Sequence, residues 1–198
     1  MSASAGTRRS QAKSDRRGQL IAAAERLMAE RGYLAVRLED IGSAVGVSGP
    51  AIYRHFPNKE ALLVELLVGI SARLLAGARE VIAETDDPTD ALDRLVERHL
   101  DFAFDESDLI RIQDRDLGHL PDTAKRQVRR SQRQYVEIWV SVLTRVDPHL
   151  AEDDARVMAH AAFGLLNSTP HSVKSAASRA QSRAVLRRMT LTALTSGQ

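Results

Sequence analysis

Residues 37–56 decide the fold of this chain, and they read Arg-Leu-Glu-Asp-Ile-Gly-Ser-Ala-Val-Gly-Val-Ser-Gly-Pro-Ala-Ile-Tyr-Arg-His-Phe. Apolar residues at helical spacing predict a short helix with one buried side, carried by Leu38, Ile41 and Val45. Gly46 follows at once, as expected where a helix ends in a left-handed residue that glycine adopts without steric strain. The stretch therefore predicts two short helices joined by a tight turn at this glycine.

The second short helix is predicted over about residues 49–55. Ser48 suits its N-cap, and Pro50 suits its first turn, where a missing N–H group leaves no hydrogen bond unmade. Ile52 and Phe56 are expected to point inward. The small residues at the start would let this end of the helix approach the edges of DNA bases. Taken alone, the stretch also fits an ordinary helix–turn–helix corner inside an α-helical core.

The chain on either side extends the pattern. Residues 53–63 read Tyr-Arg-His-Phe-Pro-Asn-Lys-Glu-Ala-Leu-Leu, and an amphipathic opening helix ends in Glu-Arg-Gly-Tyr at residues 30–33. With the turn at Gly46, the whole of residues 20–63 resembles the DNA-binding domain of TetR-family transcriptional repressors. This resemblance implies a DNA-binding head followed by a larger helical body.

The resemblance also implies roles for single residues. Phosphate contacts are expected from Tyr53, His55 and Lys59, and Arg54 lies on the same exposed side. The base-facing end of the recognition helix consists of Ser48, Gly49, Pro50 and Ala51. Phenol and imidazole groups hydrogen-bond phosphate oxygens, and a lysine in the first turn of the next helix adds charge beside its N-terminus. Arg37 stands where the family usually carries threonine, so we expect it to contact a phosphate directly.

Charge is distributed unevenly along the chain. The net charge is +2, but residues 1–60 carry ten basic against six acidic residues, and the remainder carries eighteen against twenty. A basic end on a slightly acidic body suits a protein that binds a polyanion with one part only. We expect a disordered basic arm at residues 1–14, a DNA-binding domain (the head) at 15–60, and a helical effector-binding and dimerisation domain (the body) at 61–198. The arm would follow the DNA backbone or minor groove, or serve as a solvated tail.

Composition excludes several classes of protein. The chain has no cysteine, which removes disulfides, thiolate catalysis and cysteine-based zinc sites. The chain contains no run of about 18 apolar residues, so we expect no membrane span. The N-terminus lacks an apolar signal core, so we expect a cytoplasmic location. None of the six histidines forms a His-x-x-x-His pair, and no nucleophile elbow, phosphate-binding glycine loop or dinucleotide fingerprint appears. We therefore expect no enzyme activity, cofactor or metal.

The rest of the chain predicts one helix after another, without the alternation typical of strands. An apolar stripe predicts a long helix over residues 59–84, which connects head and body. Thr89 and Asp122 are expected to cap two later helices. The remaining helices are predicted around residues 108–117, 152–166 and 176–195. We expect an all-α protein of about nine helices, with a three-helix helix–turn–helix domain followed by a larger helical domain.

The last two predicted helices carry apolar faces that include small residues. The first face comprises Met158, Ala161, Ala162, Leu165 and Leu166, and the second Ala180, Ala184, Val185, Leu186, Met189 and Ala193. Such faces either close the core of one chain or pair with a second copy. The TetR resemblance favours a homodimer through a four-helix bundle. Two heads on a two-fold frame are also what a palindromic site in double-stranded DNA requires.

The body is expected to hold an effector site. Residues 111–121, with the helix bearing Tyr135 and Trp139, resemble the body of TetR relatives that respond to acyl-coenzyme A thioesters. An apolar tunnel would take an acyl chain or a sterol fragment, lined by Phe102, Ile110, Trp139, Val142 and Phe163. Candidate polar residues of this pocket are Gln113, His119, Tyr135, Asn167 and His171.

Each of these pocket residues also has a structural interpretation. Five arginines could bind phosphates at the pocket mouth, namely Arg111, Arg126, Arg129, Arg130 and Arg133. Four of them recur at spacings of three and four, which is typical of a solvated basic stripe. Tyr135 and Trp139, at a spacing of four, are equally typical of a buried core. The polar candidates are equally typical of residues that form hydrogen bonds at helix ends.

The sequence thus predicts a DNA-binding repressor that covers a palindromic operator as a dimer and is released by a small lipophilic effector. An acyl-coenzyme A thioester is one candidate effector. The alternative is a helical protein that binds an acyl or coenzyme A ligand, or an enzyme, with no role at DNA. A third possibility is a DNA-binding regulator that responds to a protein partner.

Overall fold

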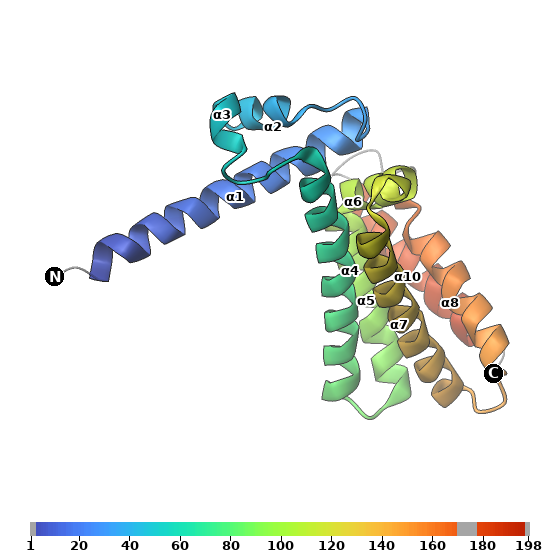
Figure 1. Cartoon of the computed structure of the whole chain (residues 1–198). Helices are drawn as coiled ribbons and strands as arrows, with labels where there is room; N and C mark the ends of the chain where they lie inside the picture. The colour runs from blue at the N-terminus through green and yellow to red at the C-terminus, as the bar shows by residue number, and fades with distance from the viewer. Residues whose placement is uncertain (1–2, 170–177, 197–198) are drawn as a thin grey trace.

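The computed structural model describes residues 3–169 and 178–196, and all regular secondary structure in these residues is helical (Figure 1). Nine α-helices and one short 3-10 helix are present there. A small head, formed by the first three helices, lies across one end of a bundle formed by the others. The prediction of an all-α protein with a helix–turn–helix head and a larger helical body is confirmed.

The head contains α1 (Ala3–Arg31), α2 (Leu38–Ala44) and α3 (Gly49–Ile52). Gly32 after α1 and Gly46 after α2 have φ angles of +88° and +69°, a region where other residues are strained. The glycine-centred turn predicted between the two short helices is therefore confirmed. Helix α2 packs on α1 and on α3, and the two short helices bury Leu38, Ile41 and Ile52 in the same apolar cluster as α1.

The recognition helix is shorter than predicted. It ends at Ile52, and residues 53–55 form a turn. The N–H groups of Arg54 and His55 reach back three residues, to carbonyl oxygens at 3.2 and 2.8 Å, so the last turn tightens and the helix does not continue. Ser48 occupies the predicted N-cap position, but its side chain makes no capping hydrogen bond.

Helix α4 (Lys59–Glu84) has the predicted bounds and joins the head to the body. Asn58 caps it, because its side chain accepts a hydrogen bond from the Ala61 N–H at 2.7 Å. Contrary to our expectation, α4 is long and apolar enough to cross a membrane. Half of its most apolar window is buried in the protein, however, so these residues serve the core of the fold.

The body consists of α5 (Pro88–Asp105), α6 (Ser107–Asp116), η1 (Leu117–His119), α7 (Asp122–Val146), α8 (Glu152–Leu166) and α10 (Arg179–Thr195). Two predicted caps are wrong. Asp87 caps α5 by accepting the Thr89 N–H at 2.9 Å, because Pro88 takes the first helical position. Pro121 precedes α7, so Asp122 is its first residue rather than its cap. His171 lies outside the described residues.

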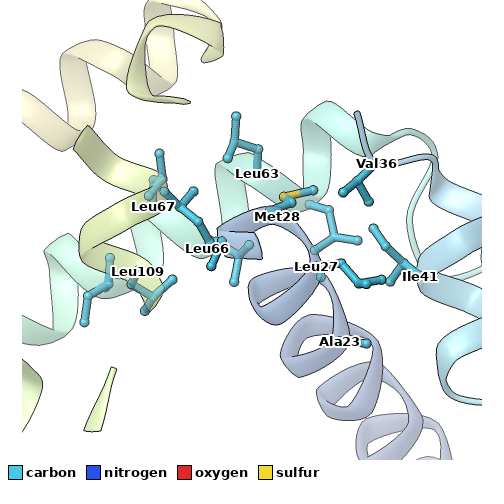
Figure 2. Packing of buried hydrophobic residues seen from close by; sticks show 14 of the residues in the cluster. Ala23, Leu27, Met28, Val36, Ile41, Leu63, Leu66, Leu67 and Leu109 are labelled. Carbon is cyan, nitrogen blue, oxygen red and sulfur yellow. The ribbon is translucent and has the colours of Figure 1, made fainter. Parts of the chain in front are cut away.

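Two clusters of buried apolar side chains hold the molecule together. The first joins head and body, because side chains from α1, α2, α4 and α6 meet in it; Figure 2 shows Met28, Ile41, Leu66 and Leu109 among them. The second fills the bundle around Trp139 and includes residues of α10. Because the first cluster runs without a break across the joint, α6 and α4 are in direct contact with α1.

Helix α10 is fixed to α5 by ion pairs as well as by the second cluster. Arg183 pairs with Glu97 and, at 2.9 Å, with Asp101, while Arg187 pairs with Glu97 at 2.6 Å and with Asp93. Exposed pairs of this kind contribute little stability one by one. As a ladder they fix how α10 is oriented on α5.

Residues 3–14 differ from the expectation of a disordered arm. From Ala3 onward they form the first part of α1, which extends away from the rest of the head (Figure 1). Extending an existing helix needs no new nucleus, and the segment contains no proline and several good helix formers. The side chains of Arg8 and Arg9 lie outside the described part of the chain.

Candidate DNA-binding surface and effector pocket

Two buried side chains anchor the exposed end of the head. Ile52 and Phe56 are fully buried, and the Phe56 ring lies 4.2 Å from the guanidinium carbon of Arg17. With these two residues fixed, the predicted DNA-contacting residues remain accessible. Ser48, Pro50, Tyr53 and Arg54 are exposed, and Gly49, Ala51 and His55 are half-buried.

Tyr53 is held at the surface by α2. It is 50% exposed, and its O–H group donates a hydrogen bond to Glu39 Oε1 at 2.5 Å. This bond raises the pKa of Tyr53 and lowers that of Glu39. A phosphate diester only accepts hydrogen bonds, so Tyr53 must turn its proton away from Glu39 before it can bind one.

His55 lies in a basic environment between the turn and α1. Burial lowers its pKa, and the charges of Lys13, Arg17, Arg54 and Arg16 lower it further. Its Nδ1 atom is buried and has no hydrogen-bond partner among the described residues. Four cations around a neutral imidazole give this side of the head a positive potential, which suits a phosphate backbone.

Lys59 is used within the protein. Its ammonium group donates to the carbonyl oxygens of Tyr33 and Val36 at 2.6 and 2.7 Å, reaches that of Leu34 at 3.4 Å, and lies 4.3 Å from the centre of the Tyr33 ring. The predicted phosphate contact of this ammonium is therefore corrected, because the loop between α1 and α2 has carbonyl groups that need donors. The Lys59 backbone N–H is in the first turn of α4, where an N–H group has no acceptor within the helix.

Arg37 stands at the N-cap of α2, where it was predicted to contact a phosphate. Its backbone N–H donates to Asp40 Oδ2 at 2.9 Å, which is the half of a capping box that does not need the N-cap side chain. The Arg37 side chain itself is exposed. A phosphate contact at this position is therefore sterically open.

Helices α4 to α8 enclose a cavity of about 280 Å³ in the body. Six of the ten residues predicted for the effector pocket line it: Phe102, Ile110, Gln113, Tyr135, Phe163 and Asn167. Six further lining residues were not predicted: Ser71, Leu74, His99, Gln132, Val136 and His160. The structure thus brings most of the predicted pocket together and adds a wall from α4.

Three of the other predicted pocket residues, Trp139, Val142 and His119, lie outside this lining, and the fourth, His171, is not among the described residues. Trp139 is fully buried behind it, with its ring edge to face against Phe163 at 5.0 Å between centroids. His119 lies in η1 at the joint between body and head, where its ring is 5.1 Å from that of Tyr33. Periodicity could not distinguish these positions, because only the three-dimensional fold decides which buried side reaches the cavity.

His99 is the most informative residue that the sequence analysis missed. It is buried, its Nδ1 lies 2.9 Å from the Tyr135 hydroxyl, and its Nε2 lies 3.0 Å from Asn167 Oδ1. Burial lowers the pKa of His99 to about 4. The ring also stacks on Phe163 at 5.2 Å. One hint was present in the sequence, because a histidine stood among the apolar positions of the predicted fifth helix.

The arginines predicted at the pocket mouth do not line the cavity. Arg111 pairs with Asp108 at 2.8 Å, and the four on α7 are exposed along that helix: Arg126, Arg129, Arg130 and Arg133. The cavity itself is lined by neutral and aromatic side chains.

Helix α6 connects the cavity to the head. Ile110 and Gln113 of α6 line the cavity. At its end, the buried carboxylate of Asp116 accepts hydrogen bonds from the Tyr33 N–H at 3.3 Å and from the Arg115 guanidinium at 3.0 Å. Arg115 in turn donates to the Met28 and Ala29 carbonyl oxygens at the end of α1. One short helix therefore forms part of the pocket wall and also caps the main helix of the head.

Helices α8 and α10 share an apolar face. Between them lies a cavity of about 200 Å³, lined by Met158, Ala161, Ala162, Leu165, Thr190, Ala193 and Leu194. Val157 and Met189, on the same two helices, are exposed by 68% and 48%. Large exposed apolar side chains next to small ones are typical of a surface that another protein covers.

Comparison with known proteins identifies the family. Residues 20–66 match the family described as bacterial regulatory proteins, tetR family, and residues 85–171 match the tetracyclin repressor-like C-terminal domain. The head and most of the body are therefore both matched. The chain belongs to the TetR family of transcriptional regulators.

Two named relatives illustrate the similarity. The chain is 32% identical to the HTH-type transcriptional regulator CymR of Pseudomonas putida, over 75% of each chain. It is 36% identical to the HTH-type transcriptional activator FasR of Mycolicibacterium smegmatis, over 46% of this chain and 41% of FasR. The second alignment thus spans less than half of that relative.

Solved structures share the fold. A TetR-family regulator from Bordetella parapertussis superimposes with a TM-score of 0.81 at 24% identity, over 90% of this chain and 94% of that one. AibR, solved with isovaleryl coenzyme A and operator DNA, gives a TM-score of 0.72 at 16% identity, over 88% and 97%. At these identities the likeness concerns the fold alone. Regulators of this family are not enzymes.

Proposed function

We propose that this protein is a transcriptional repressor that binds a palindromic operator as a homodimer and leaves it when a small lipophilic effector enters the body. TetR regulators bind DNA and dimerise. The single observation that carries the proposal is the position of α6, which lines the cavity with Ile110 and Gln113 and holds the end of α1 through Arg115. A ligand that moves α6 therefore changes the position of the head.

The mechanism is a shift between two arrangements of the dimer. In one arrangement the two heads fit successive major grooves, and in the other their separation does not match. The effector acts only as far as it prefers the second arrangement. A loss of operator affinity of about 100-fold requires a preference of about 2.7 kcal/mol, which is within the usual range of coupling energies.

At the DNA, each head would use two kinds of contact. Phosphates would be bound by Arg37, Tyr53, Arg54, His55 and the backbone N–H of Lys59. Base edges would be approached by the small residues Ser48, Gly49, Pro50 and Ala51. The start of α1 would add charge along the DNA backbone, as proposed for the basic residues before position 15.

The size of the cavity limits which part of an acyl-coenzyme A thioester could bind inside the body. AibR binds isovaleryl coenzyme A, and the body resembles acyl-coenzyme A-responsive relatives, which supports a thioester as one candidate. A cavity of about 280 Å³ has room for an acyl group but not for the nucleotide of coenzyme A. We expect the protein to act in the cytoplasm, where its operator is accessible.

The experiment that tests the proposal is an electrophoretic mobility shift with DNA from around the protein's own gene. The native protein should give a specific complex that competes with unlabelled operator but not with unrelated DNA. The variant Tyr53→Phe, Arg54→Ala should bind at least about tenfold more weakly, since it loses two phosphate donors on each head.

Arg79→Ala supplies the matched control, because Arg79 is an exposed arginine on the body. It should leave operator affinity unchanged. Equal loss of binding in both variants, or none in either, would contradict the assignment of the head as the DNA-binding surface.

A further inference from the structure

Among the described residues, the cavity that α4 to α8 enclose has no lysine, arginine, aspartate or glutamate in its lining. The lining residues that the structure describes supply amides, one serine hydroxyl, aromatic rings and apolar side chains. The titratable groups of the lining are His99, Tyr135 and His160. The charge of Arg98 acts on Tyr135, and both residues line an adjacent hollow that is separate from this cavity.

The buried hydrogen bonds of the lining fix which polar atoms remain for a ligand. Asn167 Oδ1 is an acceptor, so Nε2 of His99 must carry the proton and donate to it at 3.0 Å. His99 Nδ1 is then an acceptor and takes the Tyr135 hydroxyl proton at 2.9 Å. The imidazole stays neutral in this arrangement. Asn167 lines the cavity, and its amide N–H groups are not used in this bond, so they remain as donors for a ligand.

Aromatic rings surround the same end of the cavity. The Phe163 ring stacks on His99 at 5.2 Å and lies 5.4 Å from the Tyr135 ring, while Phe102 meets His99 edge to face at 5.7 Å. Rings in these orientations offer both faces and edges to a flat, apolar partner. At the interior packing density of about 0.74, a cavity of 280 Å³ holds about 210 Å³ of ligand, roughly 10–14 non-hydrogen atoms.

We propose that the effector is an uncharged aromatic or cyclic molecule of about this size, with one carbonyl or ether oxygen that accepts a hydrogen bond from Asn167. The proposal deepens the function given above and depends on it for its consequence at DNA. A carboxylate would lose its hydration without gaining a cation, which is unfavourable by several kcal/mol in an apolar site. A coenzyme A thioester would have to leave its phosphates outside, where no lining residue binds them.

The test uses two probes with the same number of non-hydrogen atoms, 2-acetylnaphthalene and 2-naphthoate, in calorimetric titrations of the full chain at pH 7.5. The ketone is expected to bind at least about tenfold more tightly than the carboxylate. Octanoyl-coenzyme A is the third probe and should bind more weakly than the ketone. Trp139, edge to face with Phe163, provides a fluorescence signal for the same titrations.

Variants identify the hydrogen bond. Asn167→Leu should lower the affinity for 2-acetylnaphthalene about tenfold, because the carbonyl loses its donor. The same variant should bind the hydrocarbon 2-ethylnaphthalene as the native protein does, which shows that the cavity is intact. Gln127→Leu, an exposed amide on α7, is the matched control and should change neither affinity.

Five results would overturn the proposal, and four of them concern affinities at a single pH. They are equal or tighter binding of the carboxylate, tightest binding of the thioester, binding of no naphthalene probe by natively folded protein, or an unchanged ketone affinity in Asn167→Leu. Carboxylate affinity that falls about tenfold for each unit of rising pH would show proton uptake at one of the two lining histidines, His99 or His160, and is the fifth such result. Operator binding is measured separately, so a regulator with a different effector is distinguishable from a protein that does not bind DNA.

Discussion

His99 makes the stability of the body depend on pH. Its folded-state pKa is about 4, below the ordinary value of 6.5, so the unfolded chain binds a proton that the folded protein rejects. Stability is therefore present above pH 6.5 and is lost as pH falls toward 4. Between pH 7.5 and pH 5 the loss from this one group is about 2 kcal/mol.

Urea denaturation of the native protein and His99→Gln at both pH values measures this effect. Glu25 acts in the opposite direction, because burial, followed by the charges of Glu106 and Asp108, raises its pKa to about 7. Acidification thus relieves a penalty at Glu25, and only the difference between the two proteins isolates His99. An equal pH dependence in both would mean that His99 is not neutral in the folded protein.

His55 is expected to link DNA binding to protons. Its pKa is lowered by burial and by the charges of Lys13, Arg17, Arg54 and Arg16, so the imidazole is neutral near pH 7 in the free protein. DNA phosphates would offset those charges and raise this pKa, so affinity should increase between pH 8 and pH 6, by at most about tenfold per pH unit for each proton bound.

Fluorescence anisotropy with labelled operator checks this expectation. His55→Gln should show a smaller increase than the native protein, while His149→Gln, at an exposed position after α7, should behave as the native protein does. An unchanged pH dependence in His55→Gln would remove His55 from the phosphate contacts.

Single residues were predictable where their role is local. The positive φ of Gly46 and the cap by Asn58 follow from steric and hydrogen-bonding rules that act over a few residues. The phosphate contact predicted for the Lys59 ammonium group was wrong, because the carbonyl groups that bind it, in residues 33–36, lie more than twenty residues away along the chain. His99 was missed for the same reason, since Tyr135 and Asn167 reach it only in the folded bundle.

At the scale of elements, the turn between α2 and α3 depends on the conformation of one residue. Gly46 has open space around the position of a Cβ atom, so Gly46→Ala should be destabilising through backbone strain alone, by roughly 1–2 kcal/mol. Gly18, in exposed α1, also has open space but helical geometry, so Gly18→Ala should stabilise by up to about 1 kcal/mol.

Thermal unfolding of the two variants tests both predictions. The melting temperature should fall in Gly46→Ala and rise in Gly18→Ala. A neutral Gly46→Ala would mean that the turn tolerates a side chain at positive φ. A destabilising Gly18→Ala would mean that α1 does not continue as a helix through this position.

Element bounds were predictable where both ends carry a signal. α4 begins after Asn58 and ends before the Thr-Asp-Asp-Pro stretch, and both signals are in the sequence. The recognition helix was predicted three residues too long, because the change to bonds reaching back three residues leaves no mark in composition. Residues 3–14 were predicted disordered because their composition is polar, whereas the helix behind them extends through them.

At the scale of the whole molecule, the shared face of α8 and α10 is expected to hold two copies together. Val157 and Met189 are exposed apolar side chains on these two helices, each next in sequence to a residue that lines the cavity between them. The double variant Val157→Asp, Met189→Asp would bury two charges in the interface and should give a monomer in sedimentation equilibrium at micromolar concentration. Operator affinity should fall with it, because one head contacts only half of a palindrome.

Ile82→Asp is the matched control, since Ile82 is an exposed apolar residue on α4 and 38% accessible. It should remain dimeric. A native protein that is monomeric under these conditions, or a double variant that stays dimeric, would contradict this choice of interface.

The arrangement of whole elements was predictable only through the resemblance to a family. Periodicity indicates that a helix has a buried side, but five helices contribute to the effector cavity, and no local pattern shows which of their residues meet. From the sequence, Trp139 and Phe163 were equally expected to line the pocket. Only Phe163 lines it, because α7 turns Trp139 into the core of the bundle.

The two ends of α6 have a consequence for how such a sensor diverges. Ile110 and Asp116 are six residues apart, about 9 Å along a helix, so each function has its own side chains on one short rod. Under the proposed mechanism, substitutions near Ile110 and Gln113 would change which molecule is bound, while Arg115 would keep its hydrogen bonds to the end of α1 and Asp116 its bond to Tyr33. A change of ligand, by natural drift or in the laboratory, would therefore not require a change in the contacts between α6 and the head.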